Sequence, residues 1–325
     1  MQAESGSVTQ PPDKKGRSCE NCGAELKGPY CYRCGQPTRS FISALPGLIR
    51  EIATDTLYYD SRMWRTLKAL LLSPGRLSDE YVNGRRARYT PPIRVYLVSS
   101  VLVFLMVGLV VDTAKLVEFN GNAEAAESSI EEFHAPLHFG AEAWHLEDNP
   151  VDIGWLGNRG NEWLNRQIDK IQTNIGEARR NPQRFVRSAT GTIPQVMFVL
   201  LPLFSAMVGV FYLFSRRYYI EHLLLQVHNH SFLFLCLIGL YGGISLRRVL
   251  ERSDFFAAGL LNGLLWLTVM ALWLWMPVYL LLSMKRFYRQ GWILTTVKFL
   301  TLAGSYFFLM LFAMLAIIIL GIWRL

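Results

Sequence analysis

Charged residues are scarce in this sequence of 325 residues. They make up 18% of the chain, whereas soluble globular proteins carry about 25%, and apolar residues make up 51%. Acidic residues are rarest in residues 193–325, which hold three Asp or Glu against ten Lys or Arg, spread over long apolar runs. This pattern excludes a soluble enzyme and a disordered protein. It predicts an integral membrane protein with a polar N-terminal part.

Familiar catalytic signatures are also missing from the sequence. It has no Walker loop, no Gly-x-Ser-x-Gly elbow and no dinucleotide-binding fingerprint. No Asp or Glu lies in the core of an apolar run, and no inverted repeat is visible, which disfavours proton-coupled transport. Residues 1–18 lack the apolar core of a cleavable signal peptide. Catalysis stays open, with the balance against an enzyme.

Long apolar runs predict the fold class, because only a helix of about 20 residues satisfies its own backbone hydrogen bonds across lipid. We expect an all-α integral membrane protein with about five transmembrane helices. The predicted spans are 93–111, 193–214, about 223–246, 255–284 and 299–323. The run at 223–246 is the weakest, since its first half is polar.

Lys and Arg near the span ends predict the orientation. Arg85, Arg86, Arg88 and Arg94 precede the first span, and further basic residues at 216–217 and 285–289 fall on the same side by alternation. The loop at 247–252 is basic too and disagrees. We therefore expect a multi-pass protein of the bacterial inner membrane, with a cytoplasmic N-terminus and a periplasmic C-terminus.

Four of the five cysteines form one group of two Cys-x-x-Cys-Gly motifs, with eight residues between the second and third cysteines: Cys19, Cys22, Cys31 and Cys34. Two such knuckles place four thiolates around one zinc ion, and the glycine permits the tight turn. A disulfide pair is disfavoured in a reducing cytoplasm, and a redox motif normally occurs singly. Four ligands close the coordination sphere, so the predicted zinc is structural and folds the small ribbon.

These features divide the chain into six parts. We expect a disordered tail (1–18), a zinc ribbon (19–38), cytoplasmic amphipathic juxtamembrane helices (39–92), a first span (93–111), a periplasmic loop with an amphipathic helix at 161–180 (112–192) and a four-helix transmembrane region (193–325). In the juxtamembrane part, Trp64, Leu67, Leu71 and Leu72 are expected to share an apolar face. Breaks are expected at 73–75 and at Gly84.

Basic residues before the first span suggest contact with anionic lipid headgroups. Arg85, Arg86, Arg88 and Arg94 are the candidates for a headgroup or phosphate site. Simple positive-inside anchoring explains the same residues and is favoured. Nucleic-acid binding is disfavoured, because the charge of the ribbon is balanced.

A second candidate site lies in the polar start of the run at 223–246. Glu221, His222, His228 and His230 lie within ten residues, and ionisable groups at membrane depth are usually functional. They could bind a second metal or act as acid and base. The alternative, which is favoured, is that they hydrogen-bond neighbouring helices at the end of the span.

Three blocks in order carry a resemblance to a known family. They are the Cys-x-x-Cys-Gly pairs ending in Gln36, the segment with Thr66, Ser73-Pro74-Gly75, Tyr81, Gly84, Arg86, Tyr89 and Pro92, and the segment Tyr219-x-Glu221-His222…His228-x-x-Ser231-Phe232. Together they resemble the bacterial membrane family called domain-of-unknown-function family 3667, over most of the chain except 112–192. The resemblance implies a bacterial inner-membrane protein and no particular activity.

Two functions are consistent with these features of the sequence. The favoured one is a membrane scaffold or accessory protein whose zinc ribbon recruits a cytoplasmic protein partner in an envelope-related process. The alternative is a membrane enzyme or transport component that acts on an anionic or lipid-linked substrate through the block Glu221, His222, His228 and His230. The sequence leaves the substrate, the partner and the oligomeric state open.

Overall fold

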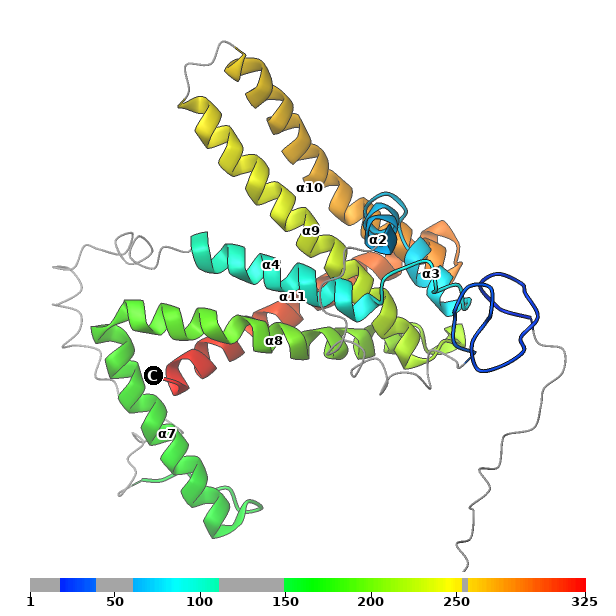
Figure 1. The fold of residues 1–325 in the computed structure, drawn as a ribbon. Coiled ribbons are helices and arrows are strands. Elements are labelled where there is room, and N and C mark those ends of the chain that lie inside the picture. Colours follow the sequence, from blue (N-terminus) through cyan, green and yellow to red (C-terminus); the bar gives the residue numbers. More distant parts are fainter. Residues whose placement is uncertain (1–17, 39–60, 111–148, 253–256) are drawn as a thin grey trace, which may run out of the picture. The chain divides into compact units, whose positions relative to one another are not determined.

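The computed structural model describes residues 18–38, 61–110, 149–252 and 257–325. The predicted tail, the first juxtamembrane residues (39–60) and the start of the predicted loop (111–148) lie outside this part. Within the described residues all regular elements are helices, joined by turns and irregular segments (Figure 1). The elements are α2 (Ser61–Leu72), α3 (Arg76–Val82), α4 (Pro92–Val110), α7 (Gly157–Arg180), α8 (Pro182–Phe211), η2 (Leu213–Ser215), α9 (Tyr219–Glu251), α10 (Ala258–Tyr288) and α11 (Trp292–Trp323).

Four helices, α8 to α11, are long and apolar enough to cross a membrane, and α4 is a shorter apolar helix. Each of the four has at least 30 residues, or about 45 Å, which exceeds the roughly 30 Å of a bilayer core. Their surfaces expose large apolar side chains such as Phe198, Leu274 and Phe312. The predicted fold class, an all-α multi-pass membrane protein with four to five spans, is confirmed.

The helices extend beyond the predicted spans. The helix α8 begins at Pro182 although the apolar run begins at 193, and α11 begins seven residues before its run. Hydropathy identifies only the part that suits lipid, whereas a helix continues wherever its backbone hydrogen bonds can form. The helix α7 covers the predicted amphipathic segment 161–180 and begins four residues earlier.

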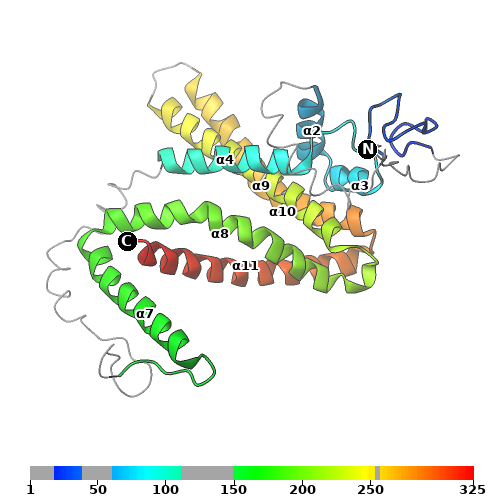
Figure 2. The same cartoon turned by 60° about the horizontal axis from the view of Figure 1, so that its bottom comes forward.

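The chain forms two compact units, and the first comprises residues 1–99 and 214–296. In it, α9 and α10 run antiparallel as a long hairpin, with α2, α3 and the start of α4 against its base (Figures 1 and 2). The core of this base contains Leu70 from α2, Tyr81 from α3, and Phe232 and Tyr279 from the hairpin. The rings of the last two stack with centroids 3.6 Å apart.

The second unit comprises residues 100–213 and 297–325. Here α8 and α11 lie antiparallel, and α7 lies near the C-terminal end of α11 (Figure 2). Ser188 donates a hydrogen bond to the carbonyl of Gly321 at 2.8 Å. At the opposite end, the ammonium of Lys298 donates to the carbonyl of Phe211 at 2.9 Å, where a cation suits the C-terminus of α8.

The apolar face predicted for α2, which touches the core through Leu71, is not the face that this helix buries most deeply. Trp64 and Leu72, expected on the apolar face, are 62% and 67% exposed, whereas Thr66 and Leu70 are fully buried. Thr66 tolerates burial because its hydroxyl donates to the carbonyl of Arg62 and accepts the backbone N–H of Thr90. Apolar spacing alone cannot identify a polar residue that is buried with its partners.

The breaks predicted around α3 are present. Gly75 precedes α3 with φ +68°, and Gly84 follows it with φ +77°. A Cβ at Gly75 would lie 2.6 Å from the carbonyl oxygen of Ser283, so the turn packs directly on the backbone of α10. Arg286 on α10 donates to the carbonyl of Pro74 at 2.8 Å. These contacts hold α2 and α3 against the hairpin.

Candidate functional site

The ribbon brings the four predicted cysteines together. The Sγ atoms of Cys19 and Cys34 are 3.6 Å apart, those of Cys22 and Cys31 are 3.5 Å apart, and all four lie within 4.8 Å of one another. Each pair sits in the same turn, closed by a 2.8 Å backbone hydrogen bond from the following glycine to the first cysteine. Both glycines, Gly23 and Gly35, have φ above +70°, as the sequence predicts.

These distances fit one tetrahedral metal ion. With metal–sulfur bonds of about 2.3 Å, a regular tetrahedron has edges of roughly 3.8 Å, close to the two distances seen here. The donor set is sulfur only, which suits a soft or borderline ion. Because four donors complete the tetrahedron, the site offers no further position to a substrate.

The four thiols lie so close together that they shift one another's pKa values. Burial raises the pKa of Cys31, but backbone N–H groups of Cys34 and Arg33 and the neighbouring thiols outweigh it and lower this pKa to about 6. The N–H of Ala24 lowers the pKa of Cys22, yet burial and the other thiols raise it to about 11. A bound cation would remove this conflict by stabilising all four thiolates.

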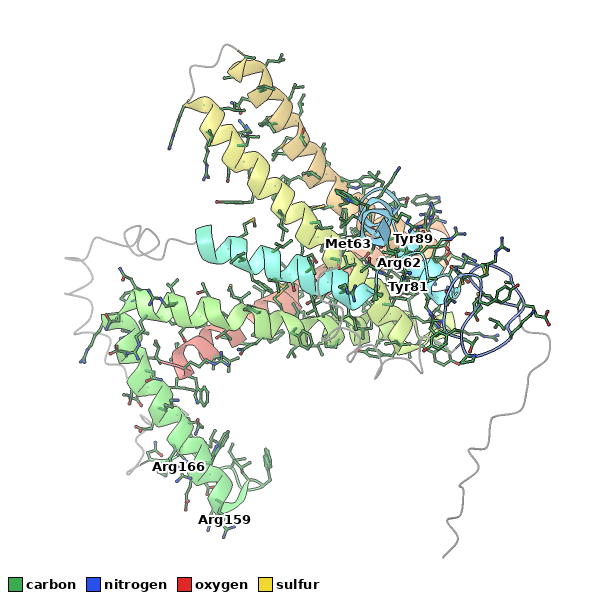
Figure 3. The ribbon with its side chains drawn as sticks, in the orientation of Figure 1. Arg62, Met63, Tyr81, Tyr89, Arg159 and Arg166 are labelled. Carbon is green, nitrogen blue, oxygen red and sulfur yellow. The ribbon has the colours of Figure 1, made fainter. Side chains whose placement is uncertain are left out.

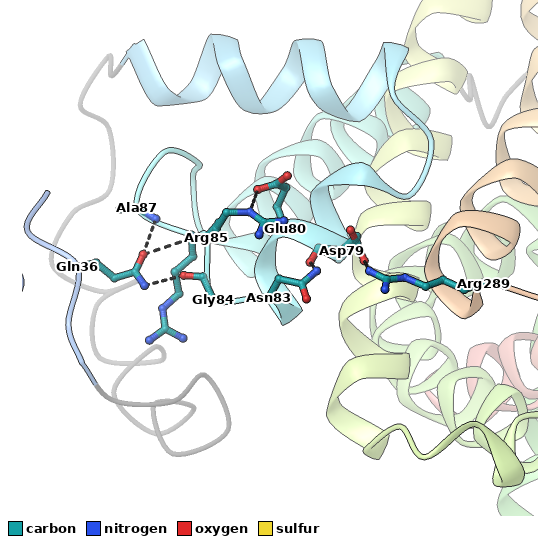
Figure 4. Close-up of polar contacts among 9 residues, drawn as sticks. Gln36, Asp79, Glu80, Asn83, Gly84, Arg85, Ala87 and Arg289 are labelled. Atoms are coloured by element: carbon teal, nitrogen blue, oxygen red, sulfur yellow. Dashed lines mark hydrogen bonds and ion pairs between the residues drawn. The ribbon is translucent and has the colours of Figure 1, made fainter. Parts of the chain in front are cut away.

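The side chain of Gln36 connects the ribbon to the segment after α3 (Figure 4). It is 4% exposed, and its Nε2 donates to the carbonyl of Gly84 at 2.6 Å. Its Oε1 accepts the backbone N–H groups of Ala87 at 3.1 Å and Arg86 at 3.4 Å. A Cβ on Gly84 would overlap the side chain of Glu20, so the ribbon lies directly on this glycine.

This segment is in turn fixed to the helices. The hydroxyl of Tyr81 donates to the carbonyl of Thr90 at 2.7 Å, next to the bond between Thr90 and Thr66. Asp79 on α3 pairs with Arg289 at the end of α10, with N and O 3.2 Å apart (Figure 4). The ribbon, α2, α3 and the ends of α9 and α10 are thus joined by polar contacts.

The histidines predicted as a second site are buried, but each has a different partner. The Nδ1 of His222 lies 2.6 Å from the hydroxyl of Tyr288 on α10, and the Nδ1 of His228 lies 2.8 Å from the hydroxyl of Ser78 on α3. His230 bonds within α9, to the carbonyl of Gln226.

Glu221 pairs with Arg217 at 3.2 Å, beside the same end of the hairpin. The four residues of this block therefore do not converge on one point, and their contacts join α9 to α3 and α10. A catalytic or metal-binding role for them stays a prediction, and the geometry supports a structural role.

The four arginines predicted as an anion site also separate. Arg85 pairs with Glu80 at 2.6 Å, and this hydrogen bond and charge raise the pKa of Arg85. The guanidinium of Arg86 donates to the carbonyl of Pro37 in the ribbon. Arg94 is half-buried in the first turn of α4. Only Arg88 lines the two basic cavities described below.

Sequence reasoning gave no role to Gln36 or Thr66, which hold the ribbon and α2 in place. Both stand in the motifs that carry the family resemblance, and that was the only signal available for them. Arg65, Lys68 and Arg76 were not proposed as site residues either. Arg65 and Lys68 lie off the predicted apolar face of their helix, and basic side chains in such positions are commonly just exposed to solvent.

A comparison with known protein families finds a match for one segment of the chain. Residues 60–104 match the model of a family described as "Protein of unknown function (DUF3667)". The match confirms the resemblance for the segment that forms α2, α3 and most of α4, while the ribbon and the histidine block lie outside it. No curated protein and no solved structure matches the chain.

Proposed function

We propose that this chain, whose residues 60–104 belong to a family without an assigned activity, is a membrane scaffold that presents a zinc ribbon to a cytoplasmic protein partner. One observation carries the proposal: the ribbon is anchored by the buried side chain of Gln36 to the juxtamembrane helices. A ribbon fixed in this way presents its surface in one orientation, whereas a ribbon on a flexible linker would not.

The metal in this proposal is a structural zinc ion held by Cys19, Cys22, Cys31 and Cys34. Zinc prefers four-coordinate tetrahedral thiolate sites of these dimensions. With almost no apolar core of its own, the ribbon would need the metal to fold. The role of zinc is therefore to hold the ribbon in the shape that Gln36 anchors.

The surface offered to the partner contains two tyrosines. Tyr30 and Tyr32 are 65% and 68% exposed, and the ammonium of Lys27 lies 5.5 Å from the ring centre of Tyr32. Aromatic side chains with a polar tip are enriched in protein interfaces. We therefore assign this part of the ribbon to partner binding, in an envelope-related process.

The same proposal places the ribbon in the cytoplasm of a bacterial cell, with the protein in the inner membrane. The contact between Asp79 and Arg289 supports the proposed span count, because both residues must lie on one side of the membrane. An even number of crossings must separate them. Four crossings, by α4, α8, α9 and α10, meet this condition, whereas α8, α9 and α10 without α4 would not. With α11 this makes five spans and puts the two termini on opposite sides, the N-terminus in the cytoplasm and the C-terminus in the periplasm in our proposal.

Affinity purification from cross-linked membranes tests the scaffold. The wild type should retain a cytoplasmic protein that the double variant Y30S/Y32S loses at unchanged membrane abundance. The matched control W155S/W163S changes two aromatic residues that are 85% and 58% exposed elsewhere, and should retain the partner. Equal retention by all three proteins would refute the proposed surface.

Metal analysis tests the zinc independently. The purified wild type should contain one zinc per chain, and the variant Cys31→Ser should lose it, because three thiolates bind far more weakly than a closed set of four. Unchanged zinc content in this variant would contradict the assignment.

A second function has one observation in its favour. The Nε2 atom of His228 is buried and lacks a hydrogen-bond partner among the described residues, which is unusual for a purely structural histidine. In the alternative, the protein is a membrane enzyme or transport component that acts on an anionic or lipid-linked substrate through this block. Single Ala variants of Glu221, His222 and His228 would then impair function in vivo without lowering membrane abundance.

A further inference from the structure

Two adjoining cavities lie along α2, of about 520 and 330 Å³. The first is lined by Asn21, Cys22, Arg33, Cys34, Arg62, Arg65, Ala87 and Arg88. The second is lined by Arg65, Lys68, Ala69, Leu72, Ser73, Arg76, Arg88 and Tyr89. Figure 3 labels one residue of each, Arg62 and Tyr89, near α2 and α3. Arg65 and Arg88 line both cavities, so the two adjoin, and we refer to them together as the basic groove.

The two halves of the groove differ in what their cations face. The first borders Cys22 and Cys34, and a zinc ion bound by four thiolates carries a net charge of minus two. Arg33 and Arg62, which line the first cavity alone, would lie near that negative charge once the metal is bound, so we invoke no further ligand for them.

No cysteine and no carboxylate is among the described residues that line the second half. It brings together the cationic side chains of Lys68, Arg76 and Arg88, and Arg65 of the first cavity also borders it. Like charges held close together repel one another, and an anion in the cavity removes that repulsion. Two hydroxyls, from Ser73 and Tyr89, add neutral hydrogen-bond donors.

We propose that this second cavity binds the phosphate group of an anionic ligand. Guanidinium groups bind phosphate oxygens in pairs, lysine binds them as a point charge, and hydroxyls complete the set. The cavity is lined from two sides, by Arg65 and Lys68 of α2 and by Arg76 at the start of α3. The turn at Gly75, packed on α10, fixes these two helices relative to each other.

The groove lies beside apolar surface, which makes a lipid headgroup the source of the phosphate. Leu72, which is 67% exposed, lines the cavity itself, and Trp64 on the same helix is 62% exposed. The indole N–H of Trp275, on the apolar helix α10, donates to the carbonyl of Leu71 at 3.3 Å. An acyl chain could therefore lie against α2 and α10 while its phosphate enters the cavity.

Isothermal titration calorimetry on the full-length protein in a non-ionic detergent tests the proposal. The ligands are dioctanoyl phosphatidic acid, dioctanoyl phosphatidylcholine and inorganic phosphate. The site variant K68Q/R76Q removes two exposed cations of the cavity, and the control R159Q/R166Q removes two exposed cations of α7, so both lower the net charge by two. Figure 3 labels both control residues.

We expect phosphatidic acid to bind the wild type with one site per chain, and more tightly than phosphatidylcholine. K68Q/R76Q should weaken this binding about tenfold or more, because two charge-assisted contacts are lost, while R159Q/R166Q should leave it unchanged. Inorganic phosphate that binds as tightly, and is weakened equally by K68Q/R76Q, would support the cavity with a soluble phosphate compound as its ligand.

Two results would overturn the proposal. The first is a wild type that binds phosphatidic acid no more tightly than phosphatidylcholine and does not bind phosphate. The second is an equal loss in both double variants, which would show attraction by net charge alone. Melting temperatures check the fold of each variant, and R88Q, which changes another exposed cation of the cavity, replaces K68Q/R76Q if that variant is unstable.

Discussion

The anchoring of the ribbon by Gln36 can be tested with a single substitution. Gln36→Ala removes the donor to the carbonyl of Gly84 and the acceptor for two backbone N–H groups. Each buried group that loses its partner costs about 1–3 kcal/mol. Water entering the gap offsets part of this, so we expect the contact between the ribbon and the segment after Gly84 to weaken by about 2–4 kcal/mol.

Hydrogen exchange measures this loss directly. In the wild type, the N–H group of Ala87 is held by Gln36 and should exchange slowly, whereas the N–H group of Arg86 is shared between Gln36 and the carbonyl of Gly84. A loss of about 2–4 kcal/mol corresponds to roughly 30- to 1,000-fold faster exchange at Ala87, with a smaller effect at Arg86. The zinc content should not change, because all four cysteines are intact.

The matched control lies in the same ribbon. Thr38→Ala removes an exposed hydrogen bond from Thr38 to the carbonyl of Pro29, which does not involve the juxtamembrane segment. This variant should leave exchange at Arg86 and Ala87 as in the wild type. If Gln36→Ala also leaves it unchanged, the ribbon is not held by this side chain, and the proposal of a rigidly presented ribbon fails.

Three further predictions concern the helices. Gly75→Ala should lower the free energy of unfolding by at least about 2 kcal/mol in thermal denaturation, because its Cβ would meet the backbone of Ser283, whereas Gly176→Ala, with open space on α7, should be neutral or stabilising. His228→Ala should lower the melting temperature because it leaves the hydroxyl of Ser78 without its partner, and an unchanged melting temperature would contradict the structural role. Reporters fused at residue 150 and after the C-terminal residue should both be active only outside the cytoplasm, and a cytoplasmic C-terminus would exclude five spans.

Apolar composition was enough to predict the membrane helices, because lipid selects for it directly along each span. It was not enough to predict where α8 and α11 begin, since their first turns need only backbone hydrogen bonds. The cysteine cluster was predictable for a different reason. Its geometry is local, and two Cys-x-x-Cys-Gly turns leave few ways to arrange four sulfur atoms.

Contacts between distant segments were beyond sequence reasoning. The amide of Gln36 meets residues 48 to 51 positions further along the chain, and nothing in its own neighbourhood indicates that partner. The basic cavity could not be predicted either, because it depends on how the chain folds. A cluster of Arg residues near the first span suggested an anion site there, but the turn at Gly75 brings Arg65, Lys68 and Arg76 together instead. Only Arg88 belongs to both sets.

The histidine block shows why polar residues in an apolar run are ambiguous. The helix α9 has 33 residues and is about 50 Å long, whereas a bilayer core needs only about 20 residues. The helix is therefore longer than one span needs, and near its N-terminal end His222 contacts Tyr288 and His228 contacts Ser78. Polar groups there meet protein rather than lipid, so the energetic penalty that makes ionisable residues in membranes a sign of function does not apply in full. Packing therefore accounts for the burial of His222 and for the Nδ1 contact of His228, though not for the unpartnered Nε2 of His228, and the exposed cations of α2 and α3 become the stronger candidates for binding a ligand.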